Sequence, residues 1–332
     1  MLRSALAAGT LVLAALLGRP AAAELPEATA LLTDLGFSAD QIGKVEAGGM
    51  VDLDIRPSSD RELATAFAFR MPSAPKELLG QLRSGLVDKT DPNTIAFGVI
   101  QGAPSLDSFA KLTLQPDAEK RARAYVTASP GGDLNLSSAE LATFGALGSG
   151  ASTAAVEQAV RAALLARLKA YQAQGLAGIA PYARDGGKER APADELRSAT
   201  RATKRLETLV PAASALLLGY PASKPPGLEE AFRWSHYQAH GVPTIALVHT
   251  LFVPDGDAFV AVQRQFYVSG GYNCEQAIAA LLPQKGGTLV VYTNRTSTDQ
   301  VLGFGGAAKR EIGSKLLASQ LQALYKKLQK AP

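Results

Sequence analysis

The feature that most constrains the fold is a run of alternating residues in the C-terminal third of the chain. Thr244–Val253 and Ala258–Val268 each show the period-two alternation of a β-strand, in which successive side chains point to opposite faces of the sheet. Residues 254–257, Pro-Asp-Gly-Asp, form a typical turn sequence between them. We therefore expect a β-hairpin here, then a short helix over Glu275–Leu282 and a third strand over Thr288–Thr293.

The chain then ends in a long amphipathic helix, expected over Gly306–Gln329. From Leu317 onward a leucine recurs at every third or fourth residue, which is the spacing of one helical face. The residues expected to face the sheet are Leu317, Leu321, Leu324 and Leu328. The residues expected on the opposite face are Lys315, Ser319, Gln322, Lys326 and Gln329.

An earlier hairpin is expected near the start of the chain. Val51–Arg56 alternates apolar and charged residues, and Leu63–Met71 is its expected partner strand. A helix follows over Lys76–Arg83. Two short apolar runs, Ile95–Ile100 and Ala110–Leu114, predict further strands.

The middle of the chain is predicted to be helical. Ser152 or Thr153 is a suitable N-cap for a long helix that ends at Gly175. A second helix is expected over Asp194–Leu209, and a short third one after Pro211. This helical insertion, about 151–220, is taken as part of a single domain spanning 24–332. The predicted fold class is α+β, with a curved antiparallel sheet packed on the long C-terminal helix and a helical middle segment.

The first 23 residues have the pattern of a secretory signal peptide. Arg3 gives the positive start, and Ala5–Leu17 is an uncharged run that is shorter than the roughly 20 residues a membrane span needs. A helix-breaking Gly-Arg-Pro then precedes three alanines, which predicts cleavage after Ala23. We expect a periplasmic or secreted protein with no transmembrane segment once this signal is removed.

Charge and cysteine content narrow the function classes. The chain has a formal net charge of +4, and two of its positive residues, Arg3 and Arg19, would leave with the signal. The surplus that is left is small and unclustered, so nucleic acid is not an expected partner. Cys274 is the only cysteine, so the chain can form no internal disulfide and needs a hydrophobic core instead.

Three C-terminal segments carry a resemblance to known sequences. They are residues 224–235, which begin Lys-Pro-Pro-Gly and end Trp-Ser, residues 264–267, Arg-Gln-Phe-Tyr, and residues 292–295, Tyr-Thr-Asn-Arg, with Asp299 and a Gly-Gly pair after them. Together they resemble a family of uncharacterised exported bacterial proteins, with a looser likeness near residues 49–70. The resemblance implies membership of that family and no particular activity.

The order of the C-terminal elements also resembles START-like (helix-grip) lipid-binding domains. In such domains an antiparallel sheet wraps a long C-terminal helix and leaves an apolar cavity between them. The strand–strand–helix unit at Val51–Arg83 would supply the other part of the grip, while the large helical insertion departs from the pattern. The resemblance implies an apolar ligand held between sheet and helix, and other α+β arrangements stay open.

Patterns for catalysis or metal binding are weak. His236 and His240 have the i, i+4 spacing of a zinc-binding helix, but the segment lacks the zincin glutamate and fits an extended strand as well. Cys274 could act as a nucleophile with His249 and Asp299, although no glycine-rich turn surrounds it. A small buried cysteine is the simpler interpretation.

Arg264 is the most unusual residue of the predicted strands. It shares a face with apolar residues such as Phe266, and a charge there needs an acidic partner, a helix C-terminus or a ligand head group. Arg295 follows another apolar strand and is expected nearby. The candidate ligand-binding residues are therefore Arg264, Arg295, Tyr267 and His249.

These observations favour an exported protein that binds or carries an apolar or anionic lipid-like ligand, such as a fatty acid, without a cofactor. Two alternatives stay open. One is a periplasmic hydrolase that uses a histidine site or the serine–lysine pair Ser73 and Lys76, although a helix N-cap is the simpler role for that serine. The other is a structural or partner-binding protein of the cell envelope.

Overall fold

The structure is a computed structural model that describes residues 25–239 and 241–329. The predicted signal peptide and His240 lie outside the described residues. A chain that begins at Glu24 contains every helix and strand of the described residues. The α-helices are α1 Ala28–Asp34, α2 Ala39–Glu46, α3 Pro75–Arg83, α4 Leu86–Thr90, α5 Ala118–Val126, α6 Ser138–Ala146, α7 Thr153–Gln174, α8 Pro192–Ala202, α9 Lys204–Leu209, α10 Pro211–Gly219 and α11 Gly306–Leu328.

An eight-stranded antiparallel sheet forms the centre of the molecule, in the order β1-β2-β10-β9-β8-β7-β6-β3. A separate two-stranded hairpin, β4-β5, lies in the segment between β3 and β6. The large sheet contains β1 Val51–Leu53, β2 Glu62–Met71, β3 Thr94–Ile100, β6 Glu229–Ala239, β7 Val242–Asp255, β8 Ala258–Val268, β9 Cys274–Gln284 and β10 Gly287–Ser297, and the small hairpin contains β4 Tyr182–Arg184 and β5 Lys188–Arg190.

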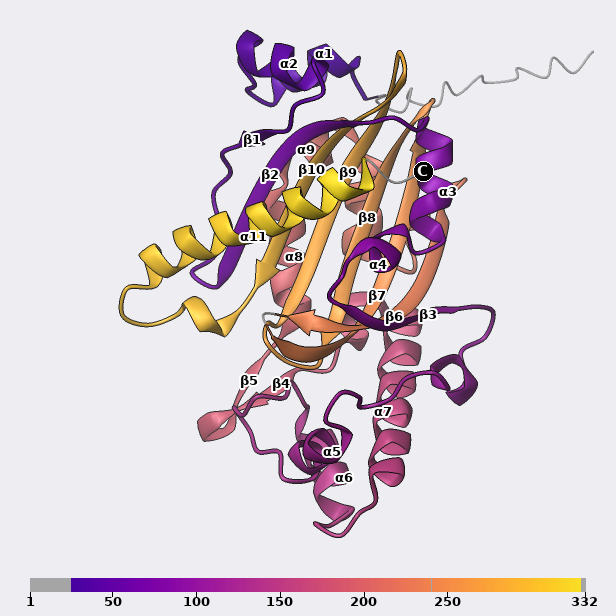
Figure 1. Cartoon of the computed structure of the whole chain (residues 1–332), viewed down its shortest axis with the longest axis vertical. Helices are drawn as coiled ribbons and strands as arrows, with labels where there is room; N and C mark the ends of the chain where they lie inside the picture. The colour runs from indigo at the N-terminus through magenta and orange to yellow at the C-terminus, as the bar shows by residue number, and fades with distance from the viewer. Residues whose placement is uncertain (1–24, 240, 330–332) are drawn as a thin grey trace, which may run out of the picture.

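The predicted α+β fold class is confirmed, as is the long C-terminal helix packed on the sheet (Figure 1). The expected hairpin between residues 244 and 268 is the pair β7 and β8, whose register closes at Asp255 and Ala258. The long middle helix is α7, which begins after its N-cap Ser152, where the serine side chain accepts a hydrogen bond from the Ala155 amide (3.2 Å).

Helices cover the two faces of the sheet differently. Figure 1 shows α3, α4 and α11 in front of the strands, with α8 and α9 behind them. We call the front the pocket face and the back the helical face. The core of the helical face joins buried residues of α7, α8 and α10 to β6–β9. The smaller core of the pocket face joins β2, β7–β10, α3 and the end of α11.

The prediction of a helix over Glu275–Leu282 was wrong, because this segment is the central strand β9. Its alanines favour a helix locally, but β9 is paired along its length with β10 and over most of it with β8. The strand alternates Glu275, Ala277 and Ala279 on the pocket face with residues that face the helices. Tertiary pairing therefore overrides local preference here.

The strand predicted over Ala110–Leu114 is also absent among the described residues, which form no regular element there. Side chains of α7 bind this backbone instead of a neighbouring strand. Arg161 Nη2 donates to the Leu112 carbonyl (2.7 Å), and the Leu114 amide donates to Glu157 Oε1 (2.8 Å). The backbone of this apolar run thus forms its hydrogen bonds with helix side chains and needs no partner strand.

Helix α11 lies over the edge of the sheet and is packed less deeply than its leucine spacing predicts. Of its residues only Leu328 is buried, while Leu317, Leu321 and Leu324 are half-buried. Its contacts with the sheet are chiefly to β2. By contrast, α7 buries six residues, among them Tyr171, which stacks on Phe266 of β8. The C-terminal helix is therefore the more weakly attached of the two long helices.

Candidate functional site

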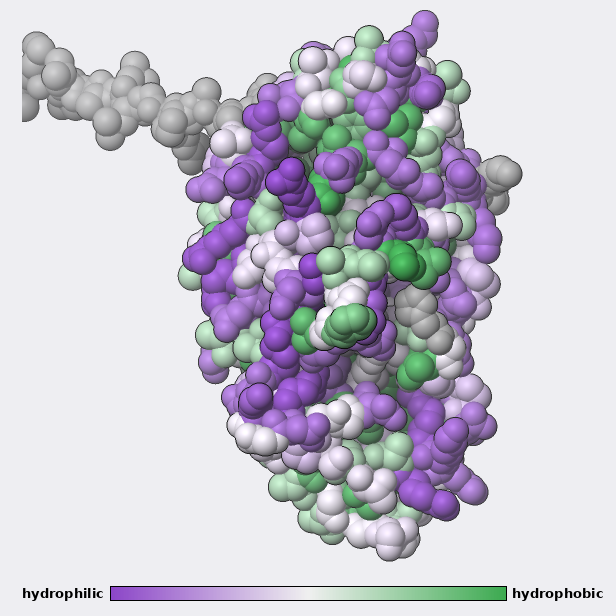
Figure 2. Space-filling view, turned by 90° about the vertical axis from the view of Figure 1, so that its left-hand side faces the viewer, coloured by the Kyte–Doolittle hydropathy of each residue, from purple (hydrophilic) through white to green (hydrophobic). Residues whose placement is uncertain are grey.

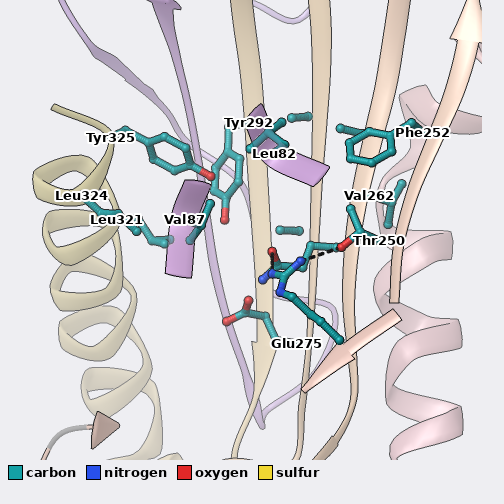
Figure 3. A pocket seen from close by; sticks show the side chains of 15 residues that line it. Leu82, Val87, Thr250, Phe252, Val262, Glu275, Tyr292, Leu321, Leu324 and Tyr325 are labelled. Carbon is teal, nitrogen blue, oxygen red and sulfur yellow. Dashed lines mark hydrogen bonds between the residues drawn. The ribbon is translucent and has the colours of Figure 1, made fainter. Parts of the chain in front are cut away.

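A pocket lies between the pocket face of the sheet and helices α3, α4 and α11 (Figure 3). It offers about 100 Å³ of space to water-sized molecules, which is several waters but less than a drug-sized ligand fills. The residues that line it are Leu82, Val87, Arg233, Thr250, Phe252, Ala261, Val262, Gln263, Glu275, Ala277, Ala279, Tyr292, Leu321, Leu324 and Tyr325.

The floor of the pocket changes from apolar to polar along the strands. Strand register aligns Phe252, Ala261, Ala279 and Tyr292 in one row across β7, β8, β9 and β10. The next row contains Thr250, Gln263 and Ala277, and a further step brings in Glu275. The small alanines of β9 leave the space that larger side chains would fill. The pocket therefore has one apolar end and one polar end.

The roof of the pocket is apolar and comes from three helices. Leu82 belongs to α3, Val87 to α4, and Leu321, Leu324 and Tyr325 to α11, and Figure 3 shows all five pointing toward the strands. Rings from both sides meet at this end, because Tyr325 lies 5.1 Å from Tyr292 and 4.9 Å from Phe69, between ring centroids. Through these ring contacts α11 covers the apolar end.

Arg233 is the charge at the polar end. Its Nη1 donates to Thr250 Oγ1 (2.8 Å) and its Nη2 to Gln263 Oε1 (2.6 Å). Its Nε lies 3.0 Å from Asp88 Oδ2, and Ser235 donates to the other oxygen of that carboxylate (2.5 Å). A guanidinium has five N–H groups, so these three contacts leave two for a ligand acceptor. The arginine is therefore held in place by the protein and still able to donate.

Glu275 also lines the polar end (Figure 3), near enough to Arg233 for the two charges to interact. Its Oε1 accepts a hydrogen bond from Gln265 Nε2 (3.1 Å), and its Oε2 accepts one from Thr296 Oγ1 (3.3 Å). Burial raises the pKa of Glu275, and the hydrogen bonds and the charge of Arg233 oppose that rise in part. The polar end thus combines donors with a carboxyl group that protonates more readily than usual.

Arg264, the leading candidate from the sequence, lies on the helical face and is fully buried. Its Nη2 donates to Gln276 Oε1 (2.7 Å) and to the carbonyl of Leu217 (2.9 Å). Leu217 lies in the last turn of α10, where backbone carbonyls carry partial negative charge. A helix C-terminus, one of the partners expected from the sequence, is therefore present.

A hydrogen-bonded chain leads from Arg264 toward the surface. Arg264 Nη1 lies 3.4 Å from the Tyr171 hydroxyl, that hydroxyl lies 3.1 Å from His249 Nδ1, and His249 Nε2 lies 3.2 Å from Glu230 Oε2. Donation in one direction, from arginine to tyrosine to histidine to glutamate, satisfies all three contacts. Burial lowers the pKa of His249 to about 4, and the hydrogen bond from His249 lowers the pKa of Glu230 to about 2.

The other two candidates also contact protein groups on this side. Arg264 of β8 and Arg295 of β10 pair in register with Gln276 from its two sides, so β9 separates the two arginines. Arg295 Nη1 donates to Glu62 Oε2 (2.7 Å) in a buried ion pair, and the guanidinium of Arg167 lies 4.3 Å from the ring centroid of Tyr267. None of the four candidates lines the pocket, and a ligand contact at any of them stays a prediction.

The catalytic patterns from the sequence are not assembled into sites. The thiol of Cys274 lies 3.7 Å from Glu195 Oε2, and burial raises the pKa of Cys274, which disfavours a nucleophilic thiolate. Asp299 pairs with arginines such as Arg184 (3.2 Å) and Arg190 (3.0 Å). Ser73 does not cap α3, since Ala74 occupies the N-cap position without a side-chain bond.

Sequence reasoning missed Arg233 and Glu275, the two charged residues of the pocket. Arg233 alternates in β6 with Phe232 and Trp234 and shares the opposite face with Ser235, so the test that selected Arg264 does not select it. Glu275 was missed because its segment, β9, was predicted to be a helix and was therefore not assigned a strand face.

Comparison with known proteins gives no relative for this chain: no family model, no curated protein and no solved structure matches it. Among the described residues, no helix has both the length and the apolar character to cross a bilayer. The same residues contain no group of three histidine, cysteine, aspartate or glutamate side chains placed to hold a metal ion.

Proposed function

We propose that this protein binds an apolar, lipid-like ligand with a small polar head group, such as a fatty acid, in the pocket between the sheet and α11. The observation that supports the proposal is the pocket's division into an apolar end, at Phe252, Tyr292 and Leu324, and a polar end, at Arg233 and Glu275. Ligand sites commonly combine an apolar wall with a few fixed polar groups.

The polar end suits a head group that can accept hydrogen bonds. Arg233 keeps two N–H groups free of its three contacts, and those contacts hold the guanidinium in one orientation. A carboxylate head would accept from Arg233, and the raised pKa of Glu275 favours a neutral carboxyl beside it. Acyl carbons would then contact Phe252, Ala279 and the leucines of α11.

The size of the pocket has a consequence for binding. About 100 Å³ accommodates only part of a long acyl chain, so a longer ligand must displace α11 or extend along it. The shallow packing of α11, with Leu328 as its one buried residue, makes that displacement the least costly route. We infer that α11 acts as the movable wall of the site.

The location of this activity, outside the cytoplasm, rests on the signal-peptide pattern of residues 1–23. N-terminal sequencing of the protein after expression in a bacterium tests it. A mature N-terminus at Glu24 in the periplasm or medium is the expected result. An uncleaved chain in the cytoplasm would contradict the export part of the proposal and leave the pocket unaffected.

Ligand uptake is tested on the chain from Glu24, purified without detergent, by native mass spectrometry before and after solvent extraction and by titration with fatty acids. We expect a stoichiometric adduct. Ala279→Leu fills the pocket from β9 and is expected to abolish it, while the matched control Ala139→Leu, on an exposed position of α6, retains it. A ligand-free mass with no uptake, or equal uptake by both variants, would refute the proposal.

A further inference from the structure

The side of the molecule on which α11 begins carries apolar side chains that contact water. Phe304, in the turn before α11, has 101% relative exposure, the largest value among the exposed large hydrophobic residues. Its neighbours Gly303 (φ 80°) and Gly305 (φ 74°) adopt left-handed backbone conformations that glycine tolerates best. The turn therefore holds a large aromatic ring away from the protein, where it has no apolar neighbour to pack against.

The outer face of α11 continues this surface. Ile312 and Leu316 are spaced i, i+4, so they lie on one side of the helix, and they are 60% and 55% exposed. Leu321 and Leu324, which line the pocket, lie on the inner side. Figure 2 looks onto this side of the molecule and shows hydrophobic side chains among hydrophilic ones near its middle. Helix α11 thus has two apolar sides, one toward the pocket and one toward water.

Positive charge surrounds the outer apolar residues. Lys309 and Lys315 are exposed within one turn of Ile312, and Lys326 and Lys327 are exposed near the end of the helix. Glu311 is the one acidic residue in α11, and it pairs with Lys315 (2.7 Å). Apolar and aromatic side chains bordered by lysines are the composition of helices that lie in the interface of anionic membranes.

We propose that Phe304, Ile312 and Leu316, together with Lys309 and Lys315, form a docking surface for an anionic lipid membrane. Phe304 and the two aliphatic side chains enter the boundary between head groups and acyl chains, and the lysines contact the lipid phosphates. The surface observations stand apart from the pocket. Its purpose, however, rests on the proposed function: a membrane contact on the movable wall of the pocket is where a lipid-like ligand would enter or leave.

Vesicle co-sedimentation tests the docking surface, using the chain from Glu24. Vesicles contain phosphatidylcholine alone or with an equal amount of phosphatidylglycerol. We expect binding to the anionic vesicles only, weakened by added salt. Phe304→Ser and Ile312→Ser should each weaken binding on the order of tenfold, and Lys309→Glu by about fivefold. The matched controls are Leu106→Ser and Lys188→Glu, which change exposed residues elsewhere and should bind as the unmodified chain does.

The outcomes separate this inference from the proposed function. The pocket-filling variant Ala279→Leu should still bind anionic vesicles, so loss of ligand uptake with vesicle binding intact would refute the pocket proposal alone. Uptake of soluble fatty acid without vesicle binding would refute the docking surface alone. Sedimentation equilibrium tests whether a second copy of the chain covers this surface instead. A dimer that Phe304→Ser and Ile312→Ser both disrupt would show that it does, and would overturn the membrane assignment.

Discussion

Each face of the central sheet holds a buried arginine, but the two arginines have different surroundings. Arg264, on the helical face, is enclosed by Gln276, Tyr171 and the end of α10, beneath deeply packed helices. Arg233, on the pocket face, contacts Asp88 and two neutral side chains and also borders open space. A buried charge alone therefore does not mark a ligand site.

The difference follows from the helices that cover each face. Helix α7 buries six residues, and on the helical face polar side chains of the sheet find partners among the helices and neighbouring strands. On the pocket face α11 buries one residue, and a pocket remains over the alanines of β9. We therefore expect substitutions on the helical face to change stability and those on the pocket face to change binding.

The largest effect is expected for Arg264→Met, which leaves the carbonyl of Leu217 without its buried donor and removes the arginine's hydrogen bonds to Oε1 of Gln276. The free energy of unfolding should fall by about 4 kcal/mol, measured by guanidinium denaturation. Arg197→Met, which removes an exposed arginine paired with Asp194, is the control and should cost less than about 1 kcal/mol. A cost below about 1 kcal/mol for Arg264→Met would break the comparison.

Lowering the pH should change the free energy of unfolding in opposite directions through His249 on the helical face and Glu275 on the pocket face. The folded pKa of His249, about 4, lies below its unfolded value of 6.5, so its contribution to stability is complete above pH 6.5 and is lost as the pH falls toward 4. That loss amounts to about 3 kcal/mol. The pKa of Glu275 is raised, so its contribution is complete below its unfolded pKa of 4.5 and is lost as the pH rises above it.

The measurement is the free energy of unfolding between pH 7 and pH 4. His249→Gln should flatten the fall, leaving the share of His236, whose pKa burial also lowers to about 4. Glu275→Gln should steepen it, because the opposing contribution is gone. Identical pH profiles for the unmodified chain and both variants would show that these groups do not set the acid response.

The two long helices should differ in their dependence on single leucines. Leu168→Ala in α7 removes a fully buried side chain and should cost about 3 kcal/mol, while Leu321→Ala in α11 removes a half-buried one and should cost about 1 kcal/mol. Thermal or denaturant unfolding measures both. Equal costs would mean that α11 is as firmly attached as α7, and would remove the argument for a movable wall.

The smallest effect on stability is expected for Glu275→Gln at neutral pH. The amide oxygen can still accept a hydrogen bond, and the substitution removes a charge whose burial is unfavourable. The free energy of unfolding should stay within about 1 kcal/mol of the unmodified value, while the affinity for a fatty acid changes. A large loss of stability would assign Glu275 a structural role instead.

Most of the fold could be predicted from alternation and spacing, because strands and helices with one buried side leave a periodic sequence. The site could not, for two physical reasons. A polar row on a strand has the same pattern whether water or a pocket covers it, so Arg233 and Ser235 were indistinguishable from a solvent-exposed face. The alanines of β9 favour a helix locally, and their role appears only when β8 and β10 lie beside them.

The strand order has a consequence for how the chain can assemble. Strands β6 to β10 follow one another both in sequence and in the sheet. Strand β2, by contrast, lies between β1 and β10. The ion pair between Glu62 of β2 and Arg295 of β10 joins positions 233 residues apart. During synthesis β1 and β2 are made early, whereas β10 is made only when the chain is almost complete. Strand β2 therefore cannot pair with β10 until late in synthesis. Such distant pairing delays completion of the sheet and leaves the second edge of β2 unpaired until β10 has been synthesised.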